Sequence, residues 1–260
     1  MRSSLAMAEA MEIERKAGKP VKVMGIVNVT PDSFSDGGQF FRPEEAIRRA
    51  KNLIADGADI IDIGGESTRP GATPIGWEEE WSRIEPVMRG LESLGGLECL
   101  VSVDTYHPET AEKAIKAGAN IINCVYGEPI PEMLKLLDGN DVELVVPVKA
   151  QSLIPHPSSL IPRLYLDPMI GFGTTREEDV GLLRSIPELA KRGRVLVGAS
   201  RKRIVKKLVG EKSSVGKNIG GNVAIAVWAA MKGASVVRVH DVKETVQALR
   251  VIDALGEGER

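Results

Sequence analysis

No stretch of the sequence approaches the run of about 20 apolar residues that is needed to span a bilayer. The first 20 residues also lack the hydrophobic core of a secretory signal and carry acidic residues early. We therefore expect a cytoplasmic protein that has no contact with a membrane. The charges nearly cancel, because 34 Lys and Arg residues stand against 36 Asp and Glu residues. A net charge of −2 gives no global electrostatic support for binding nucleic acid, so we expect none.

Cysteine is nearly absent as well, since Cys99 and Cys124 are the only two. Two cysteines without a close pair or a nearby histidine do not form a zinc site or a disulfide framework. We expect both to be buried small hydrophobic side chains. Hydrophobic residues make up 43% of the chain, which excludes disorder as its main state.

Eight short runs rich in β-branched residues alternate with helical stretches. The runs cover residues 21–29, 58–65, 99–105, 119–125, 142–148, 163–167, 195–200 and 235–240. The helical stretches cover residues 43–57, 77–96, 107–118, 131–139, 175–193, 220–233 and 241–256. Several of the runs are almost continuously apolar, as parallel strands buried on both faces are. This pattern predicts an α/β fold, a (β/α)8 TIM barrel.

One unit of the barrel departs from the pattern. Between the fifth and sixth strands lie residues 150–162, where Pro155, Pro157 and Pro162 exclude a normal helix. The fifth helix is therefore expected to be missing, which exposes one flank of the barrel. We expect residues 1–20 or a partner chain to cover that flank. The predicted organisation is an N-terminal extension over 1–20, a single barrel domain over 21–256 and a tail over 257–260.

Polar residues follow the predicted strands at the end where barrels of this kind carry their sites. They fall into two sets by chemistry. Thr68, Arg69, Arg238 and His240 suit a phosphate or diphosphate, and Asn28 with nearby oxygens suits a magnesium ion. Asp104, Asn123, Asp167 and Lys202 suit a flat, nitrogen-rich ring such as a pterin. His107 and His156 are interpreted as solvated loop residues.

Two long strings carry a family resemblance. They are NVTPDSFSDGG at residues 28–38 and DIGGESTRPG at residues 62–71, and they closely resemble the dihydropteroate synthases. Supporting matches are Val103-Asp104-Thr105, Ile122-Asn123, Asp167-Pro168 with Gly171-Phe172-Gly173, Ser200-Arg201-Lys202 and Arg238-Val239-His240-Asp241. The resemblance covers about residues 21 to 253 in the right order.

The resemblance implies a (β/α)8 barrel that joins 6-hydroxymethyl-7,8-dihydropterin diphosphate to p-aminobenzoate. It implies that Asp104, Asn123, Asp167 and Lys202 hold the pterin, and that Asn28, Thr68, Arg69, Arg238 and His240 hold the diphosphate and its Mg²⁺. Phe34, Pro70, Phe172 and Ser200 would line the arylamine side. Asp104, Lys202, Arg238 and His240 would carry the catalysis, in a homodimer.

The sequence also departs from the family pattern. Cys124 stands where the family usually has Asp, and Pro147-Val148-Lys149 replaces Met-His-Met. Met169 stands where Gly is usual after Asp-Pro, and Thr174 where Lys is usual after Gly-Phe-Gly. Two alternatives therefore stay open: a pterin-dependent methyltransferase of the same fold, and a non-catalytic pterin-binding homologue. Retention of the diphosphate set argues against the methyltransferase.

Overall fold

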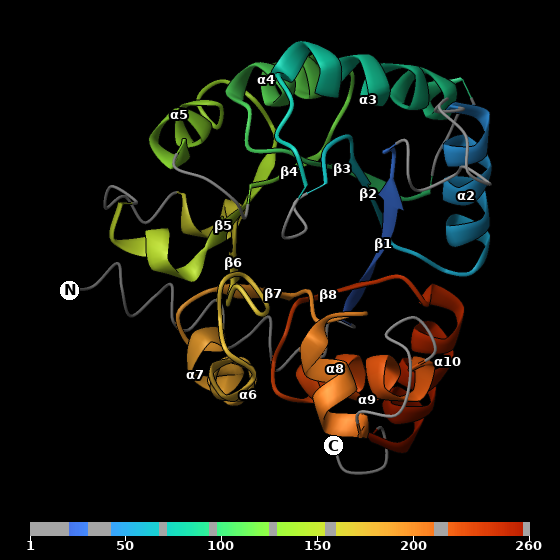
Figure 1. The fold of residues 1–260 in the computed structure, drawn as a ribbon, viewed down its shortest axis with the longest axis vertical. Helices are drawn as coiled ribbons and strands as arrows, with labels where there is room; N and C mark the ends of the chain where they lie inside the picture. Colours follow the sequence, from blue (N-terminus) through green and yellow to red (C-terminus); the bar gives the residue numbers. More distant parts are fainter. Residues whose placement is uncertain are drawn as a thin grey trace. The chain divides into compact units, whose positions relative to one another are not determined.

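Eight parallel strands form the centre of the computed structural model, which describes residues 21–30, 43–67, 72–93, 98–124, 129–153, 160–210 and 218–256. The strands are β1 (Lys22–Asn28), β2 (Ile60–Gly64), β3 (Leu100–Asp104), β4 (Ile121–Asn123), β5 (Glu143–Pro147), β6 (Leu164–Asp167), β7 (Arg194–Val197) and β8 (Val236–Val239). They close into a barrel in the order β1 to β8 (Figure 1). The expected (β/α)8 barrel is confirmed, and each of the eight predicted runs contains its strand core.

Helices alternate with these strands. They are α2 (Pro43–Ala55), α3 (Trp77–Glu92), α4 (Pro108–Lys116), α5 (Ile130–Lys135), α6 (Arg176–Arg184), α7 (Ile186–Ala190), α8 (Arg203–Val209), α9 (Ile219–Met231) and α10 (Val242–Gly256). The prediction of a single helix over 175–193 is wrong, because the structure has two helices there. Helix α6 ends at Arg184, and α7 begins at Ile186 with Pro187 in its first turn. Helix α8 was not predicted at all. None of the helices in the described ranges is long and apolar enough to cross a membrane.

The connector between β5 and β6 lacks the usual helix in its described part. It contains two 3-10 turns, η2 (Val148–Leu153) and η3 (Ile161–Arg163). This agrees with the expectation from the three prolines. Residues 1–20, which were expected to cover the flank, lie outside the described residues, so that expectation stays a prediction.

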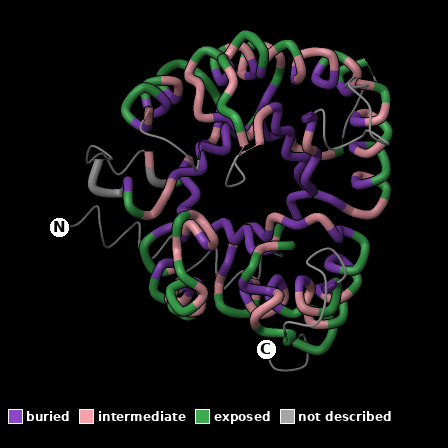
Figure 2. Tube along the Cα trace, viewed as in Figure 1, coloured by how far each residue is buried: buried purple, intermediate pink, exposed green. Residues whose placement is uncertain are grey.

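Contacts along the chain divide it into two compact units, and each is described by itself. The first is Gly25–Val146. Its strands β2 to β5 pair in parallel register, and helices α2 to α5 lie on their outer side (Figure 1). The strands are buried along their length, whereas the helices expose one side (Figure 2). All five residues of β2 are buried, as a strand covered on both faces must be.

The second unit contains Pro147–Arg260 together with the described residues 21–24. In it β6, β7 and β8 pair in parallel, and α6 to α10 pack outside them (Figure 1). Helix α6 begins with a capping box, in which the Thr175 hydroxyl accepts from the Glu178 N–H and the Glu178 carboxylate accepts from the Thr175 N–H. This cap fixes the start of the helix that follows the β6 loop.

Candidate active site

In the first unit, two candidate residues are neighbours in the sheet register. Asp104 is the last residue of β3 and pairs with Asn123, the last residue of β4. On the other side of Asp104 the register partner is Gly64, where an added Cβ would lie 3.5 Å from the Asp104 Cβ. Gly64 and the Asp104 side chain are therefore direct neighbours across the two strands. The structure therefore brings together two of the four residues that were expected to hold a pterin.

The amide of Asn123 has a fixed orientation. Its Nδ2 donates to Oδ2 of Asp62 at 3.1 Å, and Oδ1 of Asp62 accepts from the Ser102 hydroxyl at 2.6 Å. Asp62 is fully buried in β2. Because a carboxylate can only accept, the amide nitrogen must face Asp62 and the amide oxygen must point elsewhere. That oxygen is buried and has no hydrogen-bond partner among the described residues. It is an acceptor suited to a ring N–H of a ligand.

We expect Asp62→Asn to weaken pterin binding about tenfold, because an unmatched buried polar group costs about 1–3 kcal/mol. The amide of an asparagine at position 62 can both donate and accept, so it no longer fixes the orientation of the Asn123 amide. The measurement is the Kd of 6-hydroxymethyl-7,8-dihydropterin by calorimetry. Ser102→Ala is the matched control, since it removes the other partner of Asp62 and leaves the Asn123 contact. Equal losses in both variants would show that only packing was disturbed.

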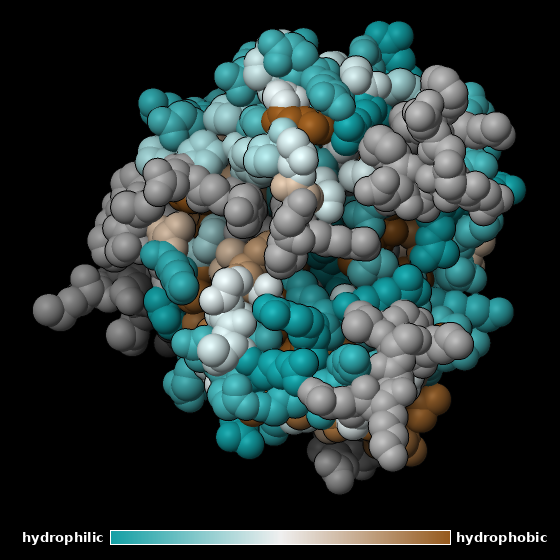
Figure 3. Space-filling model, in the orientation of Figure 1, coloured by the Kyte–Doolittle hydropathy of each residue, from teal (hydrophilic) through white to brown (hydrophobic). Residues whose placement is uncertain are grey.

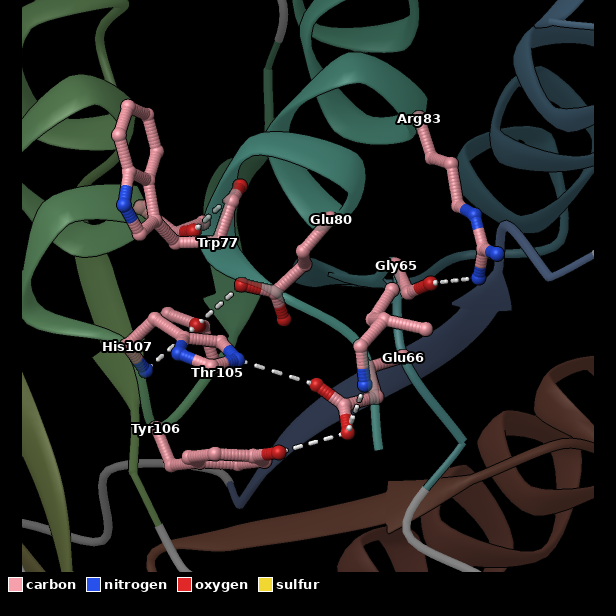
Figure 4. A network of polar contacts seen from close by, with 10 residues as sticks. Gly65, Glu66, Trp77, Glu80, Arg83, Thr105, Tyr106 and His107 are labelled. Atoms are coloured by element: carbon pink, nitrogen blue, oxygen red, sulfur yellow. Dashed lines mark hydrogen bonds and ion pairs between the residues drawn. The ribbon is translucent and has the colours of Figure 1, made fainter. Parts of the chain in front are cut away.

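A second buried network follows β2 and β3 (Figure 4). The Glu66 carboxylate accepts from the Tyr106 hydroxyl at 2.6 Å and lies 3.2 Å from Nε2 of His107. The Thr105 hydroxyl donates to Glu80 at 2.6 Å. Burial raises the pKa of Glu80, an effect that its bonds to Thr105 and Thr110 partly oppose. The interpretation of His107 as a solvated loop residue is wrong, because its side chain is only 18% exposed.

In the second unit, Asp167 ends β6 and is buried. Its Oδ1 accepts from the Met169 N–H at 2.6 Å, and this hydrogen bond closes a tight turn around Pro168. Burial raises the pKa of Asp167, while the positive charge of Lys202, the Met169 N–H and Arg238 act in the opposite direction. Lys202, which was expected in one set with Asp167, therefore acts on this carboxyl, and so does Arg238, which was expected in the diphosphate set.

The turn after β6 also explains one departure from the family pattern. Met169 has a φ of +66°, in the left-handed region that glycine adopts without strain. We expect Met169→Gly to raise the free energy of unfolding by about 0.5–1 kcal/mol, the strain of about 1–2 kcal/mol less the entropy of glycine. Thermal unfolding would measure it. Arg201→Gly is the comparison, because Arg201 has a φ of +60° but also bonds Asp241 at 2.7 Å. Stabilisation at Arg201 and none at Met169 would contradict this account.

Lys202 lies against the loop that follows Asp167. Its Nζ donates to the Ile170 carbonyl at 2.6 Å and lies 4.2 Å from the centroid of the Phe172 ring. Gly171 has a φ of +78°, and a Cβ there would meet Cδ of Lys202 at 3.0 Å. Glycine at this position therefore allows the lysine to approach. Phe172, expected on the arylamine side, contacts a residue that was expected on the pterin side.

Ser200 and His240 are hydrogen-bonded to each other. The Ser200 Oγ accepts from the His240 N–H at 3.3 Å and lies 3.1 Å from Nδ1 of the ring. Arg238 lies on β8, and His240 comes directly after the last residue of that strand. Gly198, the residue after β7, faces the Arg238 side chain, since an added Cβ there would lie in ordinary contact with it at 3.8 Å. The expected diphosphate residues of this unit therefore lie at one strand end.

Asn28 ends β1 and is half-buried. The next residue, Val29, donates its N–H to the Gly64 carbonyl at 2.8 Å, which fixes this strand end against β2. No cluster of three or more His, Cys, Asp or Glu residues that could hold a metal ion occurs in the described ranges. Phe34, Thr68, Arg69 and Pro70 lie outside the described residues.

The two cysteines are free thiols. Cys124, which follows Asn123, is buried, and burial followed by the Asp104 charge raises the pKa of its thiol to about 12. It is therefore neutral at physiological pH and is not a nucleophile. Cys99 is only partly buried, so the expectation of two buried cysteines holds for Cys124 alone.

The sequence reasoning did not find the buried groups that support these strand ends: Asp62, which orients Asn123, and the network of Glu66, Glu80, Tyr106 and His107. Asp62 and Glu66 lie inside the string at 62–71, but their side-chain partners Ser102, Asn123, Tyr106 and His107 are 40 to 61 positions away in the sequence. The one available signal was the presence of acidic residues on buried strand ends, where charged side chains need partners.

Comparisons with known proteins show the family to which the chain is similar. The family model described as "Pterin binding enzyme" matches residues 24–154 and 158–240. The chain is 38% identical to the dihydropteroate synthase of Staphylococcus haemolyticus over 263 aligned residues. The alignment covers 92% of this chain and 96% of that protein.

Two solved structures are similar over nearly the whole chain. The dihydropteroate synthase of Clostridium difficile, crystallised in the presence of pteroic acid, superposes with a TM-score of 0.83 at 36% identity, covering 92% of this chain and 97% of that one. The dihydropteroate synthase of Xanthomonas albilineans with 4-aminobenzoic acid has a TM-score of 0.80 at 38% identity, covering 91% and 93%.

Proposed function

This chain belongs to the pterin-binding enzyme family and, within it, to the dihydropteroate synthases, and on this premise we propose which residues carry the reaction. The protein is a transferase that condenses 6-hydroxymethyl-7,8-dihydropterin diphosphate with p-aminobenzoate to give dihydropteroate and diphosphate. The observation that carries this conclusion is the match of relatives that are dihydropteroate synthases along 92% of the chain. It favours the synthase over the methyltransferase and the non-catalytic alternatives.

The pterin is bound by Asp104, Asn123, Asp167 and Lys202. Two observations support this assignment. Asp104 and Asn123 are paired in the register of β3 and β4, and the buried amide oxygen of Asn123 has no hydrogen-bond partner among the described residues. In the other unit, the Lys202 charge beside buried Asp167 supports it as well. Carboxylates accept paired N–H bonds from a guanidine-like ring edge, and they stabilise positive charge that develops on the ring.

The diphosphate is bound by Asn28, Thr68, Arg69, Arg238 and His240. The reaction begins when the bond between the pterin methylene and the diphosphate oxygen breaks, and the electron pair leaves with the diphosphate. Arg238 and His240 stabilise the charge of that leaving group. The arylamine nitrogen then attacks the methylene carbon with its lone pair and gives its proton to water. No side chain has to act as a nucleophile.

Magnesium fits the donor set at the end of β1, where the Asn28 amide is half-buried and the following residue is tied to β2. An amide oxygen, diphosphate oxygens and water are ligands that Mg²⁺ prefers. When bound, the ion neutralises charge on the diphosphate.

The arylamine is bound beside Phe34, Pro70, Phe172 and Ser200. The contact of Phe172 with Lys202 and the hydrogen bond of Ser200 to His240 support this, because both link expected arylamine residues to neighbours in the catalytic set. The arylamine nitrogen must reach the carbon that the diphosphate leaves, so such links are what the reaction requires.

A homodimer is supported by the surface of the second unit. The large apolar side chains that are exposed in the described residues all lie on α8, α9 and α10: Leu208, Val209, Ile219, Met231, Val251 and Leu255. Figure 3 shows hydrophobic atoms near α9 and α10 on a face that is otherwise mostly hydrophilic. An apolar groove of about 420 Å³ lies between α6, α8 and α9. Sedimentation of the full chain tests this; a monomer at micromolar concentration would contradict it. The cytoplasmic location expected from the sequence stays a prediction.

The test of the function is diphosphate release from 6-hydroxymethyl-7,8-dihydropterin diphosphate with Mg²⁺, with and without p-aminobenzoate, followed by mass analysis. We expect dihydropteroate only when both substrates are present. Release without coupling would mean that the acceptor is a different arylamine. A folded protein that releases nothing would contradict the proposed function.

A further inference from the structure

One buried carboxylate ties together both ends of the segment that connects β2 to α3 (Figure 4). Glu66 lies two residues beyond β2, and its side chain is only 5% exposed. Its Oε1 accepts from the Ile75 N–H at 3.3 Å as well as from the Tyr106 hydroxyl at 2.6 Å. Ile75 is nine residues further along the chain and two residues before α3. The Glu66 side chain therefore fixes the distance between the start and the return of this segment.

The residues around Glu66 are themselves held in place. The Tyr106 and His107 rings contact each other at a tilt of 35° with their centroids 4.3 Å apart, and His107 Nε2 lies 3.2 Å from Oε2 of Glu66. The His107 N–H donates to the Thr105 hydroxyl at 3.0 Å, which in turn donates to Glu80 in α3. The carboxylate is thus oriented by the end of β3 and, through Thr105, by α3.

The backbone just before Glu66 is fixed as well. Nη1 of Arg83 donates to the Gly65 carbonyl at 2.8 Å. A Cβ at Gly65 would come within 2.9 Å of the Glu80 carbonyl oxygen, so the chain passes against α3 with no space for a side chain. The direction in which the chain leaves β2 is set by these contacts.

A structural role alone gives a poor account of a charged group here. Burying a carboxylate costs free energy that hydrogen bonds and a nearby cation only offset, whereas an apolar side chain would fill the same space without that cost. What the carboxylate provides is geometry, because it holds a backbone N–H nine residues away together with two aromatic side chains. Catalysis depends on positions at this scale, since a misplacement of about 1 Å can cost about 100-fold in rate.

We propose that Glu66 is a positioning residue for the departure of the diphosphate, because it fixes the chain on both sides of Thr68 and Arg69. The inference rests on the proposed function, which assigns those two residues to the diphosphate. Glu66 is not among the residues that we assign to either substrate. Its role is exerted through the segment that it closes, so its loss changes the reaction of the diphosphate substrate and leaves the pterin contacts of Asp104 and Asn123 intact.

The experiment compares Glu66→Ala and Glu66→Gln with the parent chain. We expect Glu66→Ala to lower kcat/KM for the pterin diphosphate by about 10- to 100-fold, with most of the loss in kcat. The Kd of 6-hydroxymethyl-7,8-dihydropterin, which has no diphosphate, should change by less than about twofold. Glutamine keeps one acceptor oxygen for Tyr106 and Ile75, so Glu66→Gln should recover a substantial part of the lost kcat.

Two further variants keep the test decisive if Glu66→Ala does not fold. Tyr106→Phe removes one donor to Glu66 and keeps the ring, so it should lower kcat in the same direction, by about three- to tenfold. Glu80→Gln is the matched control, because it changes the neighbouring buried carboxyl and keeps an acceptor for Thr105. It should alter the melting temperature and leave kcat and KM unchanged.

The outcomes separate this inference from the function on which it rests. If the parent chain forms no dihydropteroate, the proposed function fails. If the parent chain is active and Glu66→Ala weakens binding of the diphosphate-free pterin as much as it lowers kcat, the positioning role is wrong. Full activity in both Glu66→Ala and Tyr106→Phe would overturn it equally.

Discussion

Asparagine in place of Asp167 is expected to abolish measurable pterin binding, with a loss of affinity of about 100-fold or more. The turn after β6 decides which atom faces the ligand. The Met169 N–H binds Oδ1 of Asp167 at 2.6 Å, so the amide oxygen of an asparagine would take that position. The amide nitrogen of the asparagine would then take the place of Oδ2. Its N–H groups would face the N–H groups of the pterin ring, and no hydrogen bond could form between them. A donor left unsatisfied costs about 1–3 kcal/mol and the lost charge-assisted bonds add to it.

Calorimetric titration with 6-hydroxymethyl-7,8-dihydropterin measures this loss. Asp179→Asn is the matched control, because Asp179 is a buried carboxylate of α6 that holds the same loop by accepting from the Gly171 N–H at 2.7 Å and the Thr174 hydroxyl at 2.6 Å. It should lower the melting temperature and leave a binding signal. Unchanged affinity in Asp167→Asn would remove Asp167 from the pterin site, and equal losses in both variants would assign the effect to the loop.

The fold was predictable because its signals are local. The strands are largely buried and, apart from β6, rich in β-branched residues, and prolines mark the connector that lacks a helix in its described part. The two errors among the helices also have local causes. Pro187 lacks an N–H and so interrupts the helical hydrogen bonding after α6. The spacing of apolar residues continues past this proline, so the spacing alone predicts one helix. Helix α8 is short and mostly basic, and Ile204 and Val205 are its only buried residues. Two apolar positions are too few to show a helical repeat in the sequence.

The residues at the strand ends were predictable from the sequence, whereas the partners that hold them were not. Residues such as Asp104 and Asn123 follow from chain order, because parallel strands present their carboxyl ends together. The partners depend on register. Gly64 pairs with Asp104, so Glu66 and Tyr106, each two residues further on, become neighbours although they are 40 positions apart. No periodicity of the sequence determines that register, and His107 was misjudged for the same reason.

Family membership and structure together explain what the departures from the family pattern do to this chain. Cys124 replaces a carboxylate with a buried neutral thiol beside Asp104, which leaves Asp104 and Asp62 as the carboxyl groups next to Asn123 on β3 and β2. Thr174, where lysine is usual, donates its hydroxyl to Asp179 and so holds the loop that carries Phe172. These substitutions change the support of the site and keep its proposed ligand groups.

Removal of the Arg238 side chain is expected to separate catalysis from pterin binding. Arg238→Ala should lower kcat/KM for the pterin diphosphate by about 100- to 1,000-fold, the effect of removing one preorganised donor from a developing negative charge. The affinity for 6-hydroxymethyl-7,8-dihydropterin should fall far less. Arg238 does act on Asp167, since its charge lowers the pKa of that carboxyl, but Lys202 is the larger of the two influences and remains.

Steady-state kinetics and calorimetry on the same preparations make the comparison. Arg238→Lys should recover part of the activity, because it keeps the charge and loses the planar pair of donors. Arg201→Ala serves as the control for lost positive charge after β7, since its guanidinium is engaged by Asp241 at 2.7 Å. It should leave the kinetics within about twofold, as a partly exposed ion pair contributes little. Should Arg238→Ala reduce turnover and pterin affinity equally, the division of these residues into a pterin set and a diphosphate set would be wrong.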